Sequence, residues 1–214
     1  MKKVTITKDE IAELNKVVYK GTIHIIDSTS KARSAIAHLR KQKIVGFDTE
    51  TRPSFKKGVV RNMALMQIAT FSECFLFRIN TIGIPEVLKE FLEDNSITKV
   101  GLSLKDDFGV LKRSYSDFTP NGFIEIQKVV EDFHIADKSL QKIYAILFNK
   151  RISKGQRLTN WEATILTEAQ QEYAAIDALA CLEIYQFLNS GNFIPNKSPY
   201  YREIINPNIN TNNN

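Results

Sequence analysis

Cysteine and histidine are both scarce in this chain of 214 residues. Its 2 cysteines, Cys74 and Cys181, lie in apolar stretches and are expected to be small buried core residues rather than a disulfide pair. The 3 histidines, His24, His38 and His134, are scattered and form no cluster with the spacing of zinc ligands. The sequence therefore argues against a disulfide scaffold and against a zinc site.

Long apolar runs are also absent. No stretch reaches about 18 residues, the length of a membrane-spanning helix, and Lys2 and Lys3 are followed by no apolar signal core. We therefore expect a cytoplasmic protein that makes no contact with a membrane. Hydrophobic residues form 43% of the chain and charged residues 25%, a composition typical of a soluble globular domain.

Charge is only mildly unbalanced, because 29 Lys and Arg face 24 Asp and Glu, which gives a formal net charge of +5. This balance fits an anionic partner but does not by itself predict one. The length suits one domain with a substantial core. A nucleic-acid partner therefore has to be argued from particular residues.

Apolar periodicity predicts a mixed α/β domain with strands first and helices later. Strands are expected over residues 23–26, 43–48, 63–69, 74–79 and 99–102, and over 123–126 as the fifth strand of the main sheet. Helices are expected around 8–16, over 29–41, and from Pro85, Asp106, Ser139 and Thr167, the last running to about Leu188. The close spacing of 63–69 and 74–79 indicates an antiparallel hairpin, and Thr167 and Gln170 stand at capping-box spacing.

Three regions follow from this pattern. Residues 1–22 are polar and mixed, and are interpreted as an N-terminal extension. Residues 23–190 hold the strands and helices of the main domain. Residues 191–214 are rich in Asn and Pro, and are expected to form a disordered tail.

Four carboxylates are placed where they could meet. Asp48 and Glu50 stand two apart at the end of a predicted buried strand, so they share one face and repel each other unless a cation lies between them. Asp107 follows another strand near the start of a helix. Asp177 lies one turn after Tyr173 on the last long helix, so the two side chains share a helix face.

Each of these residues also has a purely structural interpretation. Asp48 suits a loop cap, Asp107 a charge favoured at a helix N-terminus, and Tyr173 a core position. Their conjunction instead favours a magnesium or manganese site, because these ions prefer oxygen ligands. Phosphodiester hydrolysis commonly uses two such ions about 3.5–4 Å apart.

The sequence resembles the DEDD superfamily of 3′–5′ exonucleases over roughly residues 23–190. The three motifs correspond to Val45–Glu50, to Lys99–Leu102 with Lys105–Phe108 and Leu111, and to Tyr173–Asp177; Met63–Ile68 and Asn160–Glu162 also match. The tyrosine four residues before the last aspartate resembles the tyrosine subgroup, which includes ribonuclease D and the exonuclease domain of Werner-type helicases.

The resemblance implies a ribonuclease-H-like mixed sheet flanked by helices, with a helical C-terminal half. It also implies two divalent cations, Mg²⁺ or Mn²⁺, and release of nucleoside monophosphates from the 3′ end of a strand. By resemblance Asp48 bridges both ions, Glu50 and Asp177 bind the ion that activates water, Asp107 supports the second ion, and Tyr173 orients the nucleophile. Asp106 is a rival for the role of Asp107, which the family spacing favours.

The expected partner is a DNA or RNA strand with a free 3′ end, and no required protein partner is evident. Candidate nucleic-acid contacts are Arg52, Lys56, Lys57, Arg61, Lys105 and Trp161. A solvated loop for the basic residues and a packing role for Trp161 remain open. Thr51 stands where Werner-type domains often carry an aromatic residue, so no wedge against the terminal base is expected there.

Two other functions remain open at this point. One is a nucleic-acid-binding module of the same fold with weak catalysis. The other is a metal-dependent phosphohydrolase of free nucleotides. The presence of all four carboxylates and the tyrosine argues against the first, and the basic residues around Lys56 argue against the second.

Overall fold

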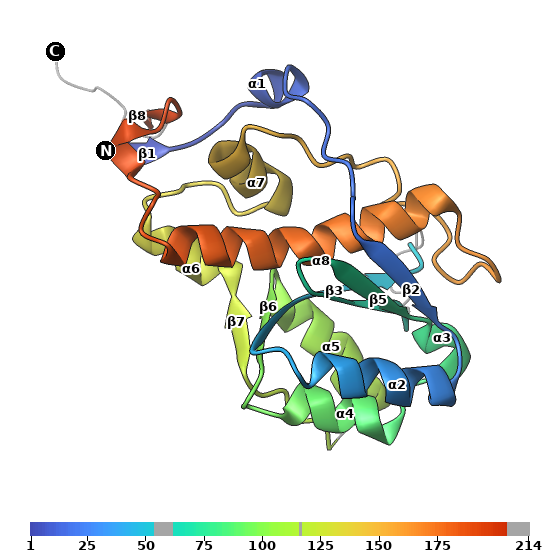
Figure 1. The fold of residues 1–214 in the computed structure, drawn as a ribbon. Helices are drawn as coiled ribbons and strands as arrows, with labels where there is room; N and C mark the ends of the chain where they lie inside the picture. Colours follow the sequence, from blue (N-terminus) through green and yellow to red (C-terminus); the bar gives the residue numbers. More distant parts are fainter. Residues whose placement is uncertain (54–61, 116, 205–214) are drawn as a thin grey trace, which may run out of the picture.

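The computed structural model describes residues 1–53, 62–115 and 117–204. Three of the predicted nucleic-acid contacts, Lys56, Lys57 and Arg61, lie outside these residues. The described residues form a six-stranded mixed sheet with helices on both faces (Figure 1). This arrangement confirms the predicted α/β class.

The strands lie side by side in the order β2-β5-β4-β3-β6-β7. Their bounds are β2 Thr22–Ile26, β5 Glu73–Phe77, β4 Met63–Ala69, β3 Ile44–Thr51, β6 Thr98–Gly101 and β7 Phe123–Glu125. The pairs β3–β4 and β4–β5 are antiparallel, which confirms the predicted hairpin, and the other pairs are parallel. The strand predicted at residues 23–26 joins this sheet as an edge strand, so β7 is its sixth strand and the prediction of a fifth was wrong.

The helices cover the two faces of the sheet unequally. Their bounds are α1 Lys8–Ala12, α2 Thr29–Leu39, α3 Ile79–Ile82, α4 Glu86–Glu93, α5 Leu104–Ser114, α6 Ile126–Asp132, α7 Leu140–Phe148 and α8 Glu168–Asn189. The long helix α8 crosses one face, where it contacts β3, β4, β5 and β6, whereas α2 and α4 lie on the other (Figure 1). Every residue of β4 is buried, because this strand is central and covered on both faces.

The N-termini of two helices that border the site are fixed differently. Helix α8 begins with the predicted capping box, in which the backbone amide of Gln170 donates a hydrogen bond to Thr167 Oγ1 at 3.2 Å. Helix α5 begins two residues earlier than predicted, because the carboxylate of Glu125 accepts hydrogen bonds from the backbone amides of Ser103 and Leu104 at 3.1 and 2.8 Å. A cap supplied from β7 cannot be recognised in the local sequence.

The two ends of the described chain pair with each other. Strand β1, Lys2–Val4, is antiparallel to β8, Tyr201–Glu203, which follows the 3₁₀ helix η1, Pro195–Lys197. The expectation of a disordered tail is therefore wrong for residues 191–204, and residues 205–214 lie outside the described part. The aromatic pair Tyr200–Tyr201 orders this segment, since both rings pack on the core around α6, α7 and α8.

The N-terminal segment also belongs to this core. Val4 and Ile6 are 0% and 1% exposed and pack in the same cluster as Ile143 of α7 and Ile184 of α8. Cys74 and Cys181 are buried and unpaired, as expected. No helix among the described residues combines the length and apolarity that crossing a membrane requires.

We expect Ile6→Ala to lower the free energy of unfolding by about 2–5 kcal/mol, because it leaves a cavity in this core. A matched control is Ile165→Ala, at a side chain that is 82% exposed, which should change stability by less than about 0.5 kcal/mol. Urea denaturation of the two variants measures both values. An Ile6→Ala protein as stable as the control would show that residues 1–22 contribute no core.

Candidate active site

The site depends on a close approach between β3 and α8. Gly46 lies in β3 directly beneath α8, and a Cβ atom at this position would overlap the carbonyl oxygen of Ala178. Because glycine has no side chain, the helix can settle onto the strand. Asp177, the neighbour of Ala178, is thereby brought over Asp48, which lies two residues beyond Gly46.

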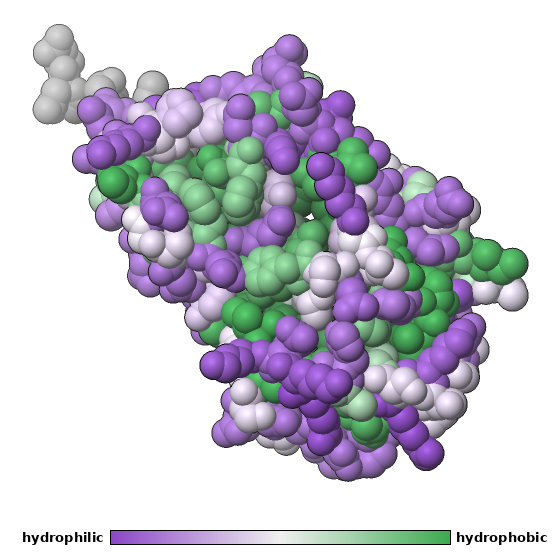
Figure 2. Space-filling model, viewed as in Figure 1, coloured by the Kyte–Doolittle hydropathy of each residue, from purple (hydrophilic) through white to green (hydrophobic). Residues whose placement is uncertain are grey.

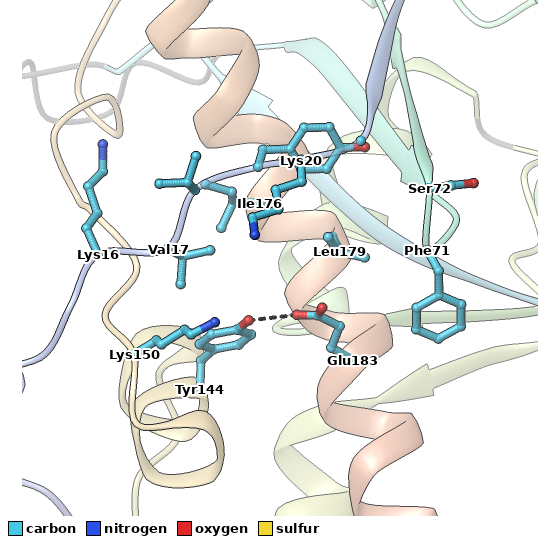
Figure 3. A pocket seen from close by; sticks show the side chains of 13 residues that line it. Lys16, Val17, Lys20, Phe71, Ser72, Tyr144, Lys150, Ile176, Leu179 and Glu183 are labelled. Carbon is cyan, nitrogen blue, oxygen red and sulfur yellow. Dashed lines mark hydrogen bonds between the residues drawn. The ribbon is translucent and has the colours of Figure 1, made fainter.

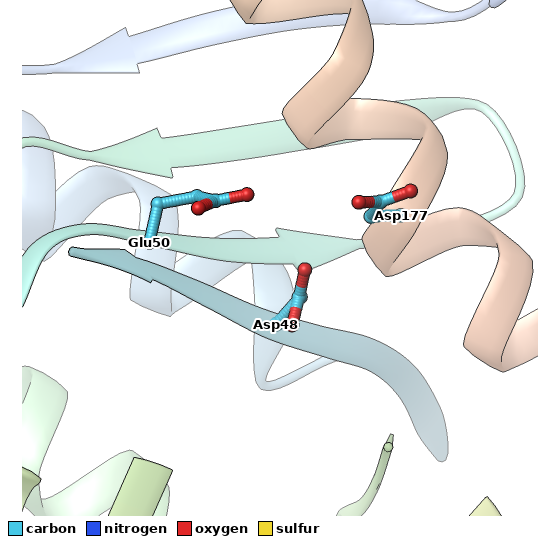
Figure 4. Close-up of side chains that lie close together, drawn as sticks. All are labelled: Asp48, Glu50 and Asp177. Atoms are coloured by element: carbon cyan, nitrogen blue, oxygen red, sulfur yellow. The ribbon is translucent and has the colours of Figure 1, made fainter. Parts of the chain in front are cut away.

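Three carboxylates converge at this contact. Asp48 and Glu50 lie on one face of β3, and Asp177 faces them from α8 (Figure 4). Each offers a carboxylate oxygen within 4.8 Å of the other two. This all-oxygen donor set fits a hard divalent ion such as Mg²⁺ or Mn²⁺.

Asp107 completes the predicted set of four in the same cleft, although it lies outside the closest group of three. It stands on the first turn of α5 and is half-buried, and its carboxylate accepts a hydrogen bond from the hydroxyl of Thr49. Asp106 also lines the cleft but is exposed. This contact with β3 favours Asp107 over Asp106 as the fourth carboxylate.

Burial and mutual repulsion raise the pKa values of these carboxyl groups. The pKa of Asp48 lies well above its usual range, because of burial first and then the charges of Asp177, Glu50 and Asp107. Burial and the charge of Asp177 raise the pKa of Glu50 to about 9. Burial also raises the pKa of Asp107 and of Asp177 to about 7. A cation between these groups would relieve this crowding.

Tyr173 lines the same cleft one turn before Asp177. Its ring packs beside Trp161, with ring centroids 6.0 Å apart, and the residue is 9% exposed. Burial, and then the charge of Asp177, raises the pKa of its hydroxyl. The hydroxyl therefore remains protonated at neutral pH, and can donate a hydrogen bond at the edge of the cleft.

The predicted nucleic-acid contacts that the structure describes do not line the cleft. Trp161 is fully buried in the cluster beneath α8, so its assignment to the rim of the cleft was wrong and the packing alternative holds. Arg52 is exposed and forms an ion pair with Glu162 at 3.2 Å. Lys105 is exposed on the first turn of α5. Neither Arg52 nor Lys105 lines the cleft.

Three other basic residues line the cleft and were missed. They are Lys138, Lys154 and Arg157. Lys138 is fixed by its ammonium group, which donates to the Gln127 carbonyl oxygen at 2.6 Å and forms an ion pair with Glu131 at 2.5 Å. Lys154 and Arg157 are exposed in the loop between α7 and α8. The basic character of residues 150–157, just before the tyrosine motif, was the signal that could have revealed the last two.

Residues 23–191 match the family model described as 3′-5′ exonuclease. The chain belongs to this family. It is 36% identical over 153 residues to the bifunctional 3′-5′ exonuclease/ATP-dependent helicase WRN of Mus musculus, covering 69% of this chain and 11% of the relative. It is 32% identical over 189 residues to a 3′-5′ exonuclease of Arabidopsis thaliana, covering 81% and 63%. The chain thus spans less than two thirds of either relative.

Solved structures show the same fold. The Nibbler EXO domain of Aedes aegypti superposes with a TM-score of 0.72 at 20% identity, covering 84% of this chain and 96% of that one. RNase D of Escherichia coli gives 0.70 at 23% identity, covering 79% and 44%. These structures confirm the predicted ribonuclease-H-like fold. The family match confirms the predicted class of enzyme, a nuclease.

The raised pKa values predict how stability depends on pH without metal. Unfolded carboxyl groups ionise near pH 4, whereas folded Asp107 and Asp177 hold their protons to about pH 7 and Glu50 to about pH 9. The free energy of unfolding therefore loses a contribution as pH rises from about 4 through these values. Asp177→Asn should remove part of the loss, and stabilise the metal-free protein at pH 8 by roughly 1 kcal/mol or more.

Melting curves in EDTA from pH 5 to pH 8 test this expectation. Asp132→Asn, an exposed change at the end of α6, is the matched control and should follow wild type throughout. Mg²⁺ or Mn²⁺ should stabilise wild type at pH 8, by about 2.7 kcal/mol at 100 times the dissociation constant. An Asp177→Asn protein that melts like wild type at both pH values would mean that the carboxylates do not repel one another.

Proposed function

We propose that this chain removes nucleoside monophosphates one at a time from the 3′ end of a nucleic acid strand, with two divalent ions bound in the cleft. The observation that supports this most is the convergence of Asp48, Glu50 and Asp177 within 4.8 Å beside Tyr173. RNase D of Trypanosoma brucei, which shares the fold, has been solved in complex with RNA U12. A strand of RNA or DNA is therefore the proposed substrate.

The carboxylates are proposed to divide between the two ions. Asp48 would be shared by both, Glu50 and Asp177 would hold the ion beside the attacking water, and Asp107 would support the second. When bound, such ions lower the pKa of water and stabilise charge on the leaving 3′ oxygen. The hydrogen bond that the Thr49 hydroxyl donates to Asp107 keeps the Asp107 carboxylate turned toward β3.

Tyr173 is proposed to orient the attacking water. Its ring packs beside Trp161. Burial raises the pKa of its hydroxyl, which lies close enough to Asp177 for the charge of that carboxylate to raise this pKa further. Because its pKa is raised, the hydroxyl acts as a hydrogen-bond donor rather than as a base. The proposed role is the one that the resemblance to the tyrosine subgroup implies.

Lys138, Lys154 and Arg157 are proposed to bind the phosphates of the last nucleotides. All three line the cleft: Lys138 just before α7, and Lys154 and Arg157 in the loop that follows it. The charge of Arg157 also opposes the rise in the pKa of Glu50. Basic side chains at this wall would hold the strand against the carboxylate side, where the scissile phosphate has to lie.

Asp48→Asn should abolish measurable hydrolysis while the fold survives, because it removes a shared metal ligand and relieves repulsion. Asp106→Asn, an exposed neighbour in the same cleft, is the matched control and should keep most of its activity. The assay follows a 3′-labelled strand with Mg²⁺ or Mn²⁺, and excess chelator should stop it reversibly. Wild-type turnover by Asp48→Asn, or in chelator, would refute the metal mechanism.

Tyr173→Phe separates the catalytic from the packing role of this residue. The ring remains, so the melting temperature should barely change, but loss of the hydroxyl should lower single-turnover hydrolysis by roughly 10- to 1,000-fold. Strand affinity should stay the same, because the basic contacts are untouched. Equal rates for the two proteins would return Tyr173 to a purely structural role.

A further inference from the structure

A second cavity, distinct from the carboxylate cleft, lies between the N-terminal segment, α7 and α8. Its volume is about 600 Å³, comparable to that of the cleft. Figure 2 shows this face of the molecule hollowed near its middle, where Figure 1 draws the N-terminal segment passing α8. The cavity shares no lining residue with the cleft, so it needs an explanation of its own.

Three lysines surround this cavity. Lys16 and Lys20 come from the N-terminal segment, and Lys150 follows α7 (Figure 3). All three are exposed, and none forms an ion pair within the described part of the chain. The one carboxylate in the lining, Glu183, accepts a hydrogen bond from the Tyr144 hydroxyl at 2.7 Å. The cavity therefore carries a positive charge that no protein group offsets fully.

An aromatic side chain completes the rim. Phe71 stands at the turn between β4 and β5, and is 54% exposed although it is large and apolar. Ile176 and Leu179 of α8 form an apolar wall between Phe71 and the lysines (Figure 3). Ammonium groups beside an exposed ring and an apolar wall suit a ligand that has both phosphate and an aromatic base.

The cavity is held in shape by contacts of its own backbone. The Val17 amide donates to the Arg151 carbonyl oxygen at 2.9 Å, which fastens the N-terminal segment to the loop after α7. The Thr22 amide donates to the Ser72 carbonyl oxygen at 2.9 Å, beside Phe71. A Cβ atom on Gly21 would come within 2.5 Å of that same oxygen, so glycine is needed for this approach.

The cavity also lies near the active site. Lys16 and Ile176 line a small cavity of about 50 Å³ as well, and Tyr173 lines that small cavity too. The loop after α7 presents Lys150 to the second cavity and Lys154 to the cleft. Four residues of extended chain span at most about 14 Å, so a bound strand of a few nucleotides could cross from one to the other.

We propose that this cavity is a second nucleotide-binding site, in which Lys16, Lys20 and Lys150 hold phosphates and Phe71 stacks on a base. The ligand is either a nucleotide of the bound strand or a free nucleoside monophosphate. Strand binding rests on the proposed function for its substrate class, but it can be measured without hydrolysis. The N-terminal segment thereby becomes part of the ligand-binding surface.

The test uses the full chain in EDTA, with a labelled single strand of about 20 nucleotides, and measures affinity against salt concentration. Lys20→Ala with Lys150→Ala should weaken binding at least tenfold and lower the slope of log K against log salt by roughly 1.4, about 0.7 for each phosphate contact. Lys41→Ala with Lys43→Ala, at exposed lysines outside both cavities, should leave affinity and slope as in wild type.

Phe71→Ala provides the complementary result. It should weaken binding roughly fivefold or more through lost stacking, with the salt slope unchanged because no charge is removed. Nucleoside monophosphate added as a competitor identifies the source of the ligand. If it lowers the strand affinity of wild type to that of the variants, the site accepts a free nucleotide. If it leaves the wild-type affinity unchanged, the site binds the strand alone. The proposal would be overturned if the double lysine variant and Phe71→Ala both bound the strand with wild-type affinity and slope and both bound nucleoside monophosphate as wild type does.

Hydrolysis separates this proposal from the proposed function. With Mg²⁺ or Mn²⁺, the double lysine variant should raise KM for the long strand and leave turnover of a dinucleotide as in wild type. A protein that binds the strand through these lysines but hydrolyses nothing would refute the exonuclease and leave the second site standing. Equal KM values for the long strand in wild type and variant would refute strand binding at the second site and leave the exonuclease standing.

Discussion

The contact between the backbone of β3 and the backbone of α8 is the constraint on which the rest of the site depends. At Gly46 the helix lies so close that no side chain fits between. This contact sets the height of α8 above the sheet, and with it the separation of Asp177 from Asp48 and Glu50. The small residues of α8 at this contact, Ala174, Ala175 and Ala178, serve the same close packing.

The site therefore has an energetic cost, because the same close packing that forms it buries four carboxyl groups next to one another. Close packing excludes water, and burial is the largest cause of the raised pKa in each of the four carboxyl groups. A core of hydrophobic residues in the same volume would be more stable. A bound cation would turn this repulsion between carboxylates into attraction, which is the physical reason to expect a metal ion in the cleft.

Much of this could be predicted from sequence, because local patterns carry it. The strand period places Asp48 and Glu50 on one face, and the helix period places Tyr173 beside Asp177. Thr167 and Gln170 mark the start of α8 by their spacing alone. The family motifs then fix which of these residues meet, which periodicity by itself does not.

Other features depend on long-range contacts and could not be predicted in that way. Glu125 caps α5 from a neighbouring strand, and an exposed Lys154 enters the cleft only because the loop folds back over α8. Trp161 carries a ring that suits either a nucleic-acid contact or a core, and its burial depends on how β4 and α8 enclose it. Residues 191–204 are polar on average, yet a few aromatic rings suffice to order them.

The pairing of β1 with β8 has a consequence for the order of assembly. Lys3 and Arg202 stand at opposite ends of the described chain, yet they face each other in a strand pair. The entropic cost of closing a loop grows slowly, by about 0.6 kcal/mol for each doubling of its length, so the long stretch between the two strands adds little to the cost of pairing them. The pair can form only after the last strand has been synthesised. The carboxylate cleft, built from β3, α5 and α8, can assemble before that strand exists. The wall beside Lys16 and Lys20 is fastened to Arg151 and Ser72 and can form with it, so only β1 has to wait for the last strand.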